Sequence, residues 1–549
     1  MSSTNKKQLF LKILFLLLFG FSIILTFSKY IPPNMDEYSL YHTLMCHYYP
    51  NNSLNVFREN CQGYDLNLLN TGLVLPLREY AYMGSLTSLI YYPLFLIWKN
   101  PDSARFLGII LLFLQAIILS KLFKSRIEYV FLGLISFFPY FFQHVVDTGD
   151  VGLQCCGVFL VLLLFKKWFM TYKTKYAALI SFVIFLGVWT KLTFFFVLPG
   201  VGSIVLMQIL QNKKQFLKKR VVKSALYGII IATILLLGLL SLLFLSTSPS
   251  NSHERPYLNQ IMNSKSQDLG EIINIKILQS RLFKTLLNPF EATQRIYSDV
   301  TTYTHSGSVK PPNLFVYFYD FLVYLTPFIF WIIVRHKNKQ HQTLATTSLI
   351  FYFAFVLTLF LILKTENTWA MHHIVLAFPF LILSYLAIID LLKETKIGRK
   401  VIVFGFIIFI LMNCYFFFTF YHKEFPSQTD FSRIKMNGLL KNEYLANNYF
   451  YVVTDWGMYY YQALYGDKSQ SVLYMEPLRD AWQVNALKEL SKKHNRKILF
   501  IYNSKVMSSD HNLIENNFVL KDCSVITSQS VWKIRLEYDT DPRNICFSK

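Results

Sequence analysis

The sequence predicts an α-helical polytopic membrane protein with a small α/β domain at its C-terminal end. Apolar residues make up 53% of the 549 residues and charged residues only 16%. The apolar residues gather in runs of roughly twenty, the length that crosses a hydrocarbon core. Basic residues cluster at the ends of these runs, and the pattern changes after residue 421. The composition therefore excludes a soluble globular protein, a disordered chain and a small disulfide scaffold.

Eleven apolar runs are predicted to span the membrane. The first, Leu9–Ser28, follows two lysines but precedes no cleavage site of small residues, so we interpret it as an uncleaved span. The predicted spans are 9–28, 104–122, 127–146, 151–167, 176–190, 192–210, 224–246, 313–334, 343–363, 372–391 and 400–421.

The apolar segment Met83–Trp98 is too short to span and contains Pro93, which indicates an interfacial or re-entrant helix. If it does not span, every large basic cluster falls on one side of the membrane, and the opposite short loops hold only Lys191 and Lys364. The positive-inside rule then predicts a cytoplasmic N-terminus and an external C-terminus. Few alanines and many Lys, Asn, Phe and Ile residues favour a bacterial inner membrane, with the C-terminal domain in the periplasm.

This orientation divides the chain into a transmembrane catalytic domain, 1–421, and an extracytoplasmic domain, 422–549. Two loops of the first domain, 29–103 and 247–312, are also external. The C-terminal part alternates strand-like runs with one helical run, Ala481–His494, which is typical of a small α/β domain. Its strand-like runs are Tyr449–Thr454, Lys497–Tyr502 and Val531–Tyr538.

Four of the seven cysteines are predicted to be external, where oxidation favours pairing. We predict the disulfides Cys46–Cys61 and Cys523–Cys546, with four unrelated thiols as the alternative. Cys155, Cys156 and Cys414 lie within predicted spans and are expected to be small buried apolar residues.

Two acidic turns follow predicted spans on the external face. Asp36 and Glu37 come after the first span, and Asp147 and Asp150 come after the third. Carboxylates at the membrane boundary can take a proton from an attacking hydroxyl, and Asp36 with Asp147 can hold a divalent cation such as Mg²⁺ or Mn²⁺. The alternatives are a solvated loop for the first turn and helix capping for the second.

Cationic residues and histidines share this predicted face. Lys191 lies at an outward turn between two apolar runs, Arg105 opens the second span, and Arg58 and Arg78 lie in the first external loop. Arginine can bind a donor phosphate with two parallel hydrogen bonds, and lysine can bind it as a point charge. The alternative is that these side chains only contact lipid headgroups. The candidates for lining an external cavity are His305, His372 and His373.

Acidic turns, cations and a membrane-edge position suit transfer of a sugar from a lipid phosphate. The lipid tail stays in the bilayer, cations stabilise the leaving phosphate, and a carboxylate takes the proton of the acceptor hydroxyl. No Walker loop and no GxGxxG motif are present, so a soluble nucleotide donor is not indicated. A divalent cation is optional, because Lys191 and the arginines can balance the phosphate.

The layout of residues 9–421 resembles the GT-C superfamily of polytopic glycosyltransferases, in particular the relatives of protein O-mannosyltransferases and of aminoarabinose transferases. Asp36-Glu37 is similar to the first-loop acidic motif of that family. Ser103 to Leu107 resembles its small-x-Arg entry to the second span, and Met83–Trp98 its juxtamembrane helix. Pro139 followed by Asp147 resembles its proline before an acidic second loop.

Softer similarities are Lys191 with Pro199, His305 with Tyr317 and Pro327, and His373 with Pro379. The resemblance implies inverting transfer from a polyprenyl-phosphate-linked sugar to a protein, lipid or glycan acceptor. It implies Asp36 as base or metal-associated carboxylate, supported by Glu37, Asp147 and Asp150.

Three other functions remain open. A polysaccharide polymerase or ligase uses the same donors. A secondary transporter predicts broken mid-membrane segments and matching halves, which we do not find in the sequence. A non-enzymatic scaffold would bind a partner through the C-terminal domain. The net charge of +22 indicates that the protein contacts the anionic cytoplasmic leaflet. Nucleic-acid binding is not expected, because no nucleic-acid-binding motif accompanies the charge.

Overall fold

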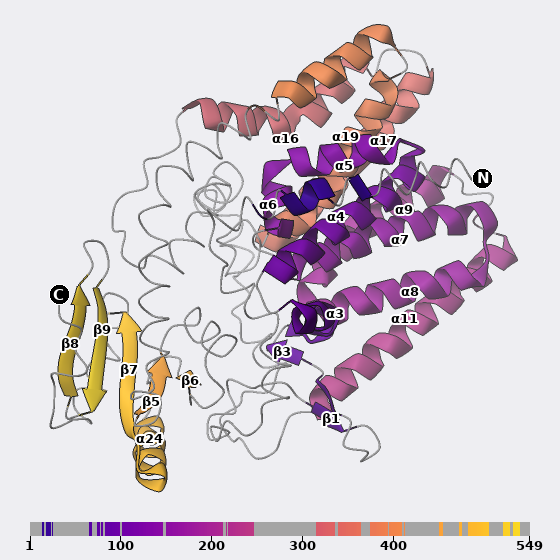
Figure 1. Cartoon of the computed structure of the whole chain (residues 1–549). Coiled ribbons are helices and arrows are strands. Elements are labelled where there is room, and N and C mark those ends of the chain that lie inside the picture. The colour runs from indigo at the N-terminus through magenta and orange to yellow at the C-terminus, as the bar shows by residue number, and fades with distance from the viewer. Residues whose placement is uncertain are drawn as a thin grey trace, which may run out of the picture. The chain divides into compact units, whose positions relative to one another are not determined.

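The structure of the chain is a computed structural model, shown in Figure 1. It describes residues 14–15, 18–22, 25, 65–67, 74–76, 78–80, 83–98, 102–145, 150–211, 216, 218–245, 314–334, 339–363, 374–393, 395–408, 411, 449–453, 472–474, 481–503, 520–526 and 531–537. These residues belong to two compact units, one helical and one built on a sheet.

The helical unit begins, in its described part, with short strand pairs and a juxtamembrane helix. The strands are β1 (Asp65–Asn67), β2 (Val74–Pro76), β3 (Arg78–Tyr80) and β4 (Met83–Gly84). They pair antiparallel as β1–β2 and β3–β4. Helix α3 (Leu86–Ile97) follows, and its twelve residues are fewer than a span needs. It lies within the segment predicted to be a non-spanning helix.

One predicted span is broken. The run 127–146 forms two helices, α5 (Ile127–Ser136) and α6 (Phe138–Val145), after the long helix α4 (Asp102–Phe123). Pro139 has no N–H to donate to the carbonyl of residue 135, and its ring would clash with that carbonyl. Helix α5 therefore ends at Ser136, and the proline lies in the first turn of α6. The predicted span over 127–146 stays a prediction.

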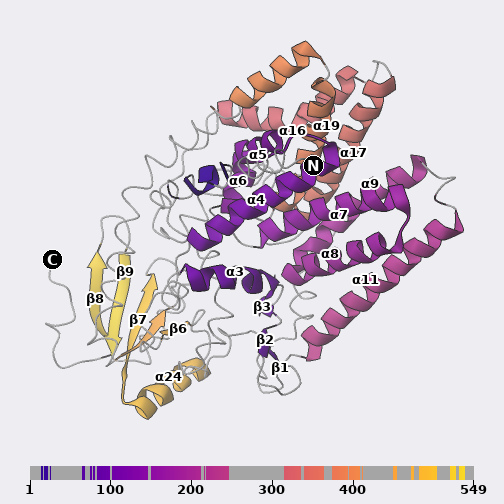
Figure 2. The same cartoon turned by 45° about the vertical axis from the view of Figure 1, so that its right-hand side comes forward.

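Helices α7 (Val151–Thr171), α8 (Thr174–Thr190) and α11 (Lys219–Leu245) pack side by side (Figure 2). Polar side chains link them, since Trp168 Nε1 donates to Ser224 Oγ at 2.9 Å and Ser181 Oγ donates to the carbonyl of Gly228 at 2.6 Å. Small residues let helix backbones approach closely in membranes, and such hydrogen bonds add to the packing. Between α8 and α11, the 3₁₀ turn η3 (Leu192–Val197) leads into α9 (Leu198–Gln211).

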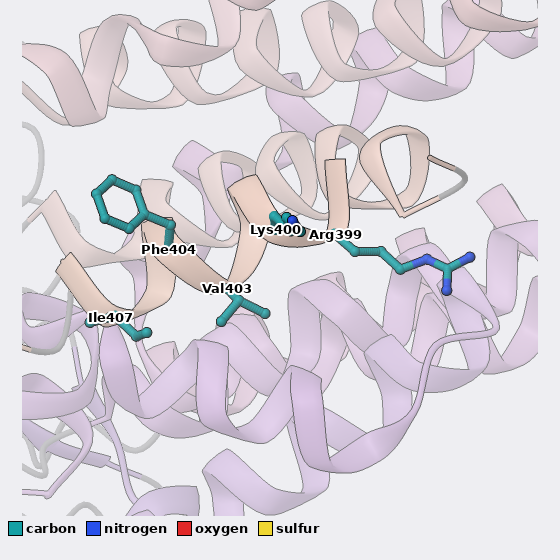
Figure 3. Close-up of a pocket in the computed structure, with 5 residues that line it drawn as sticks. All are labelled: Arg399, Lys400, Val403, Phe404 and Ile407. Atoms are coloured by element: carbon teal, nitrogen blue, oxygen red, sulfur yellow. The ribbon is translucent and has the colours of Figure 1, made fainter. Parts of the chain in front are cut away.

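A second group of packed helices comprises α16 (Leu314–Val334), α17 (Lys339–Leu363) and α19 (Phe378–Leu392), which follows the short turn η4 (Val375–Ala377). Ser348 and Ser384 join α17 to α19, since each hydroxyl donates to the other residue's carbonyl, at 3.1 Å and 2.8 Å, and the two hydroxyl oxygens lie 2.8 Å apart. The last described helix of this unit covers 396–408 and carries several exposed apolar side chains (Figure 3).

The protein is a helical membrane protein by the length and apolarity of its helices. In the described part, six segments meet both criteria for a span: Ser103–Phe123, Val151–Thr171, Leu192–Gln211, Lys219–Ser241, His341–Leu363 and Val375–Leu392. Each overlaps most of a predicted span. The total of eleven spans and the orientation in the bilayer stay predictions.

The second unit contains a five-stranded sheet in the order β6-β5-β7-β9-β8. Its elements are β5 (Tyr449–Val453), β6 (Val472–Tyr474), α24 (Ala481–His494), β7 (Lys497–Asn503), β8 (Leu520–Ile526) and β9 (Val531–Glu537). Strands β6, β5 and β7 run parallel, and β9 lies antiparallel between β7 and β8. Three strands and the helix lie at their predicted positions, whereas β6 and β8 were missed. The domain boundary and its external location stay predictions.

Two of the cysteine predictions are confirmed, and the others are not tested by the described residues. Cys155 and Cys156 are free thiols buried in α7, as predicted. Cys523 lies in β8, and Cys46, Cys61, Cys414 and Cys546 lie outside the described residues. Both predicted disulfides therefore stay predictions.

Candidate functional site

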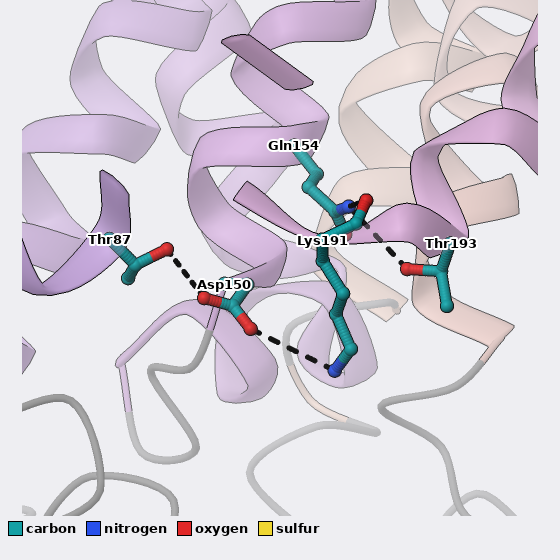
Figure 4. A network of polar contacts seen from close by, with 5 residues as sticks. All are labelled: Thr87, Asp150, Gln154, Lys191 and Thr193. Carbon is teal, nitrogen blue, oxygen red and sulfur yellow. Dashed lines mark hydrogen bonds and ion pairs between the residues drawn. The ribbon is translucent and has the colours of Figure 1, made fainter. Parts of the chain in front are cut away.

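An ion pair joins two of the predicted site residues. Asp150 directly precedes α7, and Lys191 follows the last residue of α8. The Lys191 Nζ lies 3.8 Å from Asp150 Oδ2 (Figure 4). The Asp150 side chain is fully buried, and the Lys191 side chain keeps 16% of its surface exposed. Two helix ends that are 41 residues apart in sequence thus place opposite charges together.

The second oxygen of the carboxylate contacts the juxtamembrane helix. Thr87, in the first turn of α3, donates its hydroxyl to Asp150 Oδ1 at 2.5 Å (Figure 4). Both side chains are buried. Asp150 makes no side-chain capping bond to α7, so the capping alternative does not describe its carboxylate. The positive end of the α7 dipole still favours a negative charge at this position.

Two further polar residues hold the turn that carries Lys191. Gln154 lies one helical turn after Asp150 in α7, and its Nε2 donates to the Lys191 carbonyl at 3.0 Å. The same nitrogen lies 3.4 Å from Thr193 Oγ1 in η3. Residues four apart share a face of a helix, so α7 contacts both the side chain and the backbone of Lys191. We call Thr87, Asp150, Gln154, Lys191 and Thr193 the Asp150 site.

Two glycines allow the close approach of these segments. A Cβ on Gly84 would lie 1.7 Å from the carbonyl oxygen of Trp189, so only glycine lets the start of α3 reach the end of α8. A Cβ on Gly187 would lie 2.7 Å from the ring of Phe194. The glycines therefore set the spacing between Thr87 and the turn at Lys191.

A buried hydrogen-bond network lies next to the site. Gln115, in the middle of α4, accepts from the Tyr140 hydroxyl at 2.7 Å and donates to the carbonyl of Gly152 at 3.2 Å. Its Nε2 also lies 2.9 Å from His144 Nε2, and His144 Nδ1 lies 2.7 Å from the Tyr140 carbonyl. Nδ1 must donate to that carbonyl, so Nε2 accepts from Gln115 and the imidazole is neutral. The network fixes α6 and the first turn of α7, two residues after Asp150.

The charges of the site suit recognition of an anion. The distance of 3.8 Å between Lys191 Nζ and Asp150 Oδ2 is that of an ion pair and is longer than a direct charge-assisted hydrogen bond of about 2.8 Å. Lysine binds phosphate as a point charge, and its partial exposure gives access. The buried Asp150 is suited to orient Lys191 and to balance its charge.

The other predicted site residues are distributed as follows. Arg105 lies in α4, is fully buried and has contacts within the chain, which leaves it no exposed surface for a phosphate. Arg78 begins β3. The remaining candidates, Asp36, Glu37, Arg58, Asp147, His305, His372 and His373, lie outside the described residues. The described part of the chain contains no cluster of three metal-ligating side chains, and a site made with Asp36 and Asp147 is not tested by it.

Sequence reasoning missed Thr87, Gln154 and Thr193 in the site, and Gln115 and Tyr140 beside it. The two glutamines carry the signal that could have found them, because an amide inside an apolar run needs a hydrogen-bond partner. The threonines carry no such signal, since a single hydroxyl can bond within its own helix.

Comparison with known proteins gives one structural match to report. No protein-family model and no curated protein sequence matches the chain. Among solved structures, the chain is similar to ArnT from Cupriavidus metallidurans bound to undecaprenyl phosphate, with 10% identity, a TM-score of 0.44 and 100% of both chains covered. At this identity and TM-score the match assigns neither fold nor activity, so the proposals below rest on the contacts of the site.

Proposed function

We propose that the protein transfers a sugar from a polyprenyl-phosphate-linked donor to an acceptor at the extracytoplasmic membrane surface. The observation that carries this proposal is the ion pair of Asp150 and Lys191 at the ends of two membrane helices, with the cation partly exposed. A phosphate attached to a lipid tail would meet Lys191 at the membrane boundary. The acceptor, whether protein, lipid or glycan, would approach from outside.

The chemistry requires one bond to form and one to break at the anomeric carbon. The acceptor oxygen attacks this carbon, the bond to the phosphate oxygen breaks, and the phosphate keeps the electron pair. We assign stabilisation of the leaving phosphate to Lys191, since a fixed cation stabilises charge that develops in the transition state. Attack from the face opposite the phosphate inverts the configuration.

The proton of the acceptor needs a separate carboxylate. Both oxygens of Asp150 already have partners, Thr87 and Lys191, and its side chain is fully buried. Asp150 is therefore better suited to positioning Lys191 than to removing a proton. We assign the base to Asp36, supported by Glu37 and Asp147, and leave a divalent cation at Asp36 and Asp147 as an option.

A transfer assay with purified protein and defined polyprenyl-phosphate-linked sugars tests the proposal. Lys191→Gln should lower kcat by about a hundredfold or more, the usual effect of removing one donor that stabilises developing charge. Asp36→Asn should abolish transfer. Lys219→Gln removes an exposed lysine at the start of α11 and should leave transfer unchanged. Equal rates for Lys191→Gln and Lys219→Gln would remove Lys191 from the mechanism.

The second candidate function is proton-coupled transport. The network of Gln115, Tyr140 and His144 lies inside the helical unit next to a buried carboxylate, an arrangement that also occurs in proton relays. Uptake of a substrate into liposomes that contain no acceptor would support proton-coupled transport, provided that the variant His144→Phe loses this uptake. Transfer without uptake would exclude it. A polymerase or ligase would differ from the first proposal only in using a growing glycan as acceptor.

A further inference from the structure

A groove on helix 396–408 lies outside the Asp150 site and has no role in the proposed transfer. It has a cavity volume of about 470 Å³, within the range of small-molecule pockets, and five lining residues from one helix. These are Arg399, Lys400, Val403, Phe404 and Ile407. Figure 3 shows that they divide along the helix, with the two cations at one end and the apolar side chains toward the other.

The arginine at the end of the groove is held in place. Arg399 Nε donates to the carbonyl of Lys393 at 2.9 Å, which fixes the guanidinium against the end of α19. This bond uses one of the five guanidinium N–H donors, and the other four belong to the two terminal NH₂ groups. Gly398 donates its N–H to Thr395 Oγ1 at 2.9 Å, so the turn before Arg399 is hydrogen-bonded as well. A guanidinium held in this way loses little freedom when it binds a phosphate.

The apolar half of the groove is open. Val403, Phe404 and Ile407 are 59%, 66% and 50% exposed. From Arg399 to Ile407 the helix rises about 12 Å, which allows contact with a headgroup and with the first part of an acyl chain. The shape is that of an amphiphile, with charge at one end and hydrocarbon at the other.

The charge around the groove favours an anion. Residues 390–400 contain four basic and two acidic residues. Lys393 forms an ion pair with Asp390. Across the described part of the chain, no ion pair is formed by Arg399 or Lys400. Arg399 and Lys400 line the groove, so a negative charge bound there would lie beside these two cations.

We propose that this groove binds an anionic phospholipid of the leaflet that faces the basic helix ends. The phosphodiester contacts Arg399 and Lys400, and an acyl chain lies along Val403, Phe404 and Ile407. The site differs from the Asp150 site in its residues and ligand, and does not depend on the transfer activity.

The test compares two lipids that differ only in headgroup. The full chain is reconstituted in nanodiscs with equal amounts of phosphatidylglycerol and phosphatidylcholine of matched acyl chains, and the retained lipids are measured by native mass spectrometry. Phosphatidylglycerol should be enriched several-fold. Arg399→Gln and Lys400→Gln should each reduce this enrichment about fivefold, the typical effect of one basic residue near an anionic surface. Phe404→Ala should reduce retention of both lipids without changing their ratio.

Lys396→Gln is the matched control. It removes the same charge three residues before Arg399, and Lys396 does not line the groove. It should keep the enrichment. Equal retention of the two lipids by the unaltered protein would overturn the proposal, as would an equal loss in Lys396→Gln and Arg399→Gln. The substituted side chains are exposed, so helical content measured by circular dichroism should not change.

Discussion

Replacing Asp150 by Asn removes the negative charge of the ion pair but keeps the shape of the side chain. At 3.8 Å and an effective dielectric constant of about 20, two unit charges attract by about 4 kcal/mol. Desolvation of both groups offsets part of this, and the exposed fraction of Lys191 gives its ammonium access to water in the variant. We therefore expect Asp150→Asn to lower the free energy of unfolding by about 2 to 3 kcal/mol.

A double-mutant cycle isolates the pair. Asp150→Asn, Lys191→Gln and the double variant are unfolded by SDS in mixed micelles, with helical circular dichroism as the signal. We expect the double variant to be more stable than the sum of the single effects predicts, with a coupling of about 2 kcal/mol. Lys219→Gln should shift stability by less than about 0.5 kcal/mol. Additive effects within about 0.5 kcal/mol would show that the two charges do not interact as described.

Four other substitutions, one of them a control, are compared by the same unfolding measurement. Gly84→Ala should cost about 3 kcal/mol or prevent folding, because its Cβ would lie 1.7 Å from the Trp189 carbonyl oxygen. A Cβ on Gly202 in α9 would have no atom within 4 Å, so Gly202→Ala should be neutral or stabilising by up to about 1 kcal/mol. Equal losses of stability in Gly84→Ala and Gly202→Ala would contradict the close approach at Gly84. Gln115→Leu should cost about 2 to 4 kcal/mol, since Tyr140, His144 and the Gly152 carbonyl each lose a hydrogen-bond partner. A neutral result would show that the network is not formed. Ser384→Ala should cost only about 0.6 kcal/mol, as is usual for hydrogen bonds between membrane helices, and a loss above about 2 kcal/mol would give this serine a larger role.

The helices of the membrane part could be located from the sequence because hydropathy and length act over many residues at once. The run 151–167 predicts most of α7, and 224–246 predicts most of α11. The break at Phe137 was missed, because a proline near the end of a span can either kink a helix or start a new one, and packing decides between the two.

The sequence predicts the charged residues of the candidate site but not its uncharged ones. Asp150 and Lys191 were found because ionised groups at the membrane boundary need partners, and the structure brings these two together. Thr87 could not be found from the sequence, since its bond to Asp150 depends on the approach of α3 to the end of α8. Gly84 permits this approach, and no local sequence pattern predicts it. For Arg105 the sequence predicts a cation at the external face but does not indicate that its side chain is fully buried, and its contact with a phosphate stays a prediction.

The stability cycle and the transfer assay ask different questions of the same two charges, and their combination decides the role of Asp150. If Asp150 only orients Lys191, Asp150→Asn should lower kcat by less than Lys191→Gln, because the ammonium remains to contact the phosphate. If Asp150 instead removes the proton, Asp150→Asn should lower kcat at least as much as Asp36→Asn does. Coupling in the cycle with unchanged transfer in both single variants would make the pair a structural contact, and the chemistry would then have to lie at Asp36 and its neighbours alone.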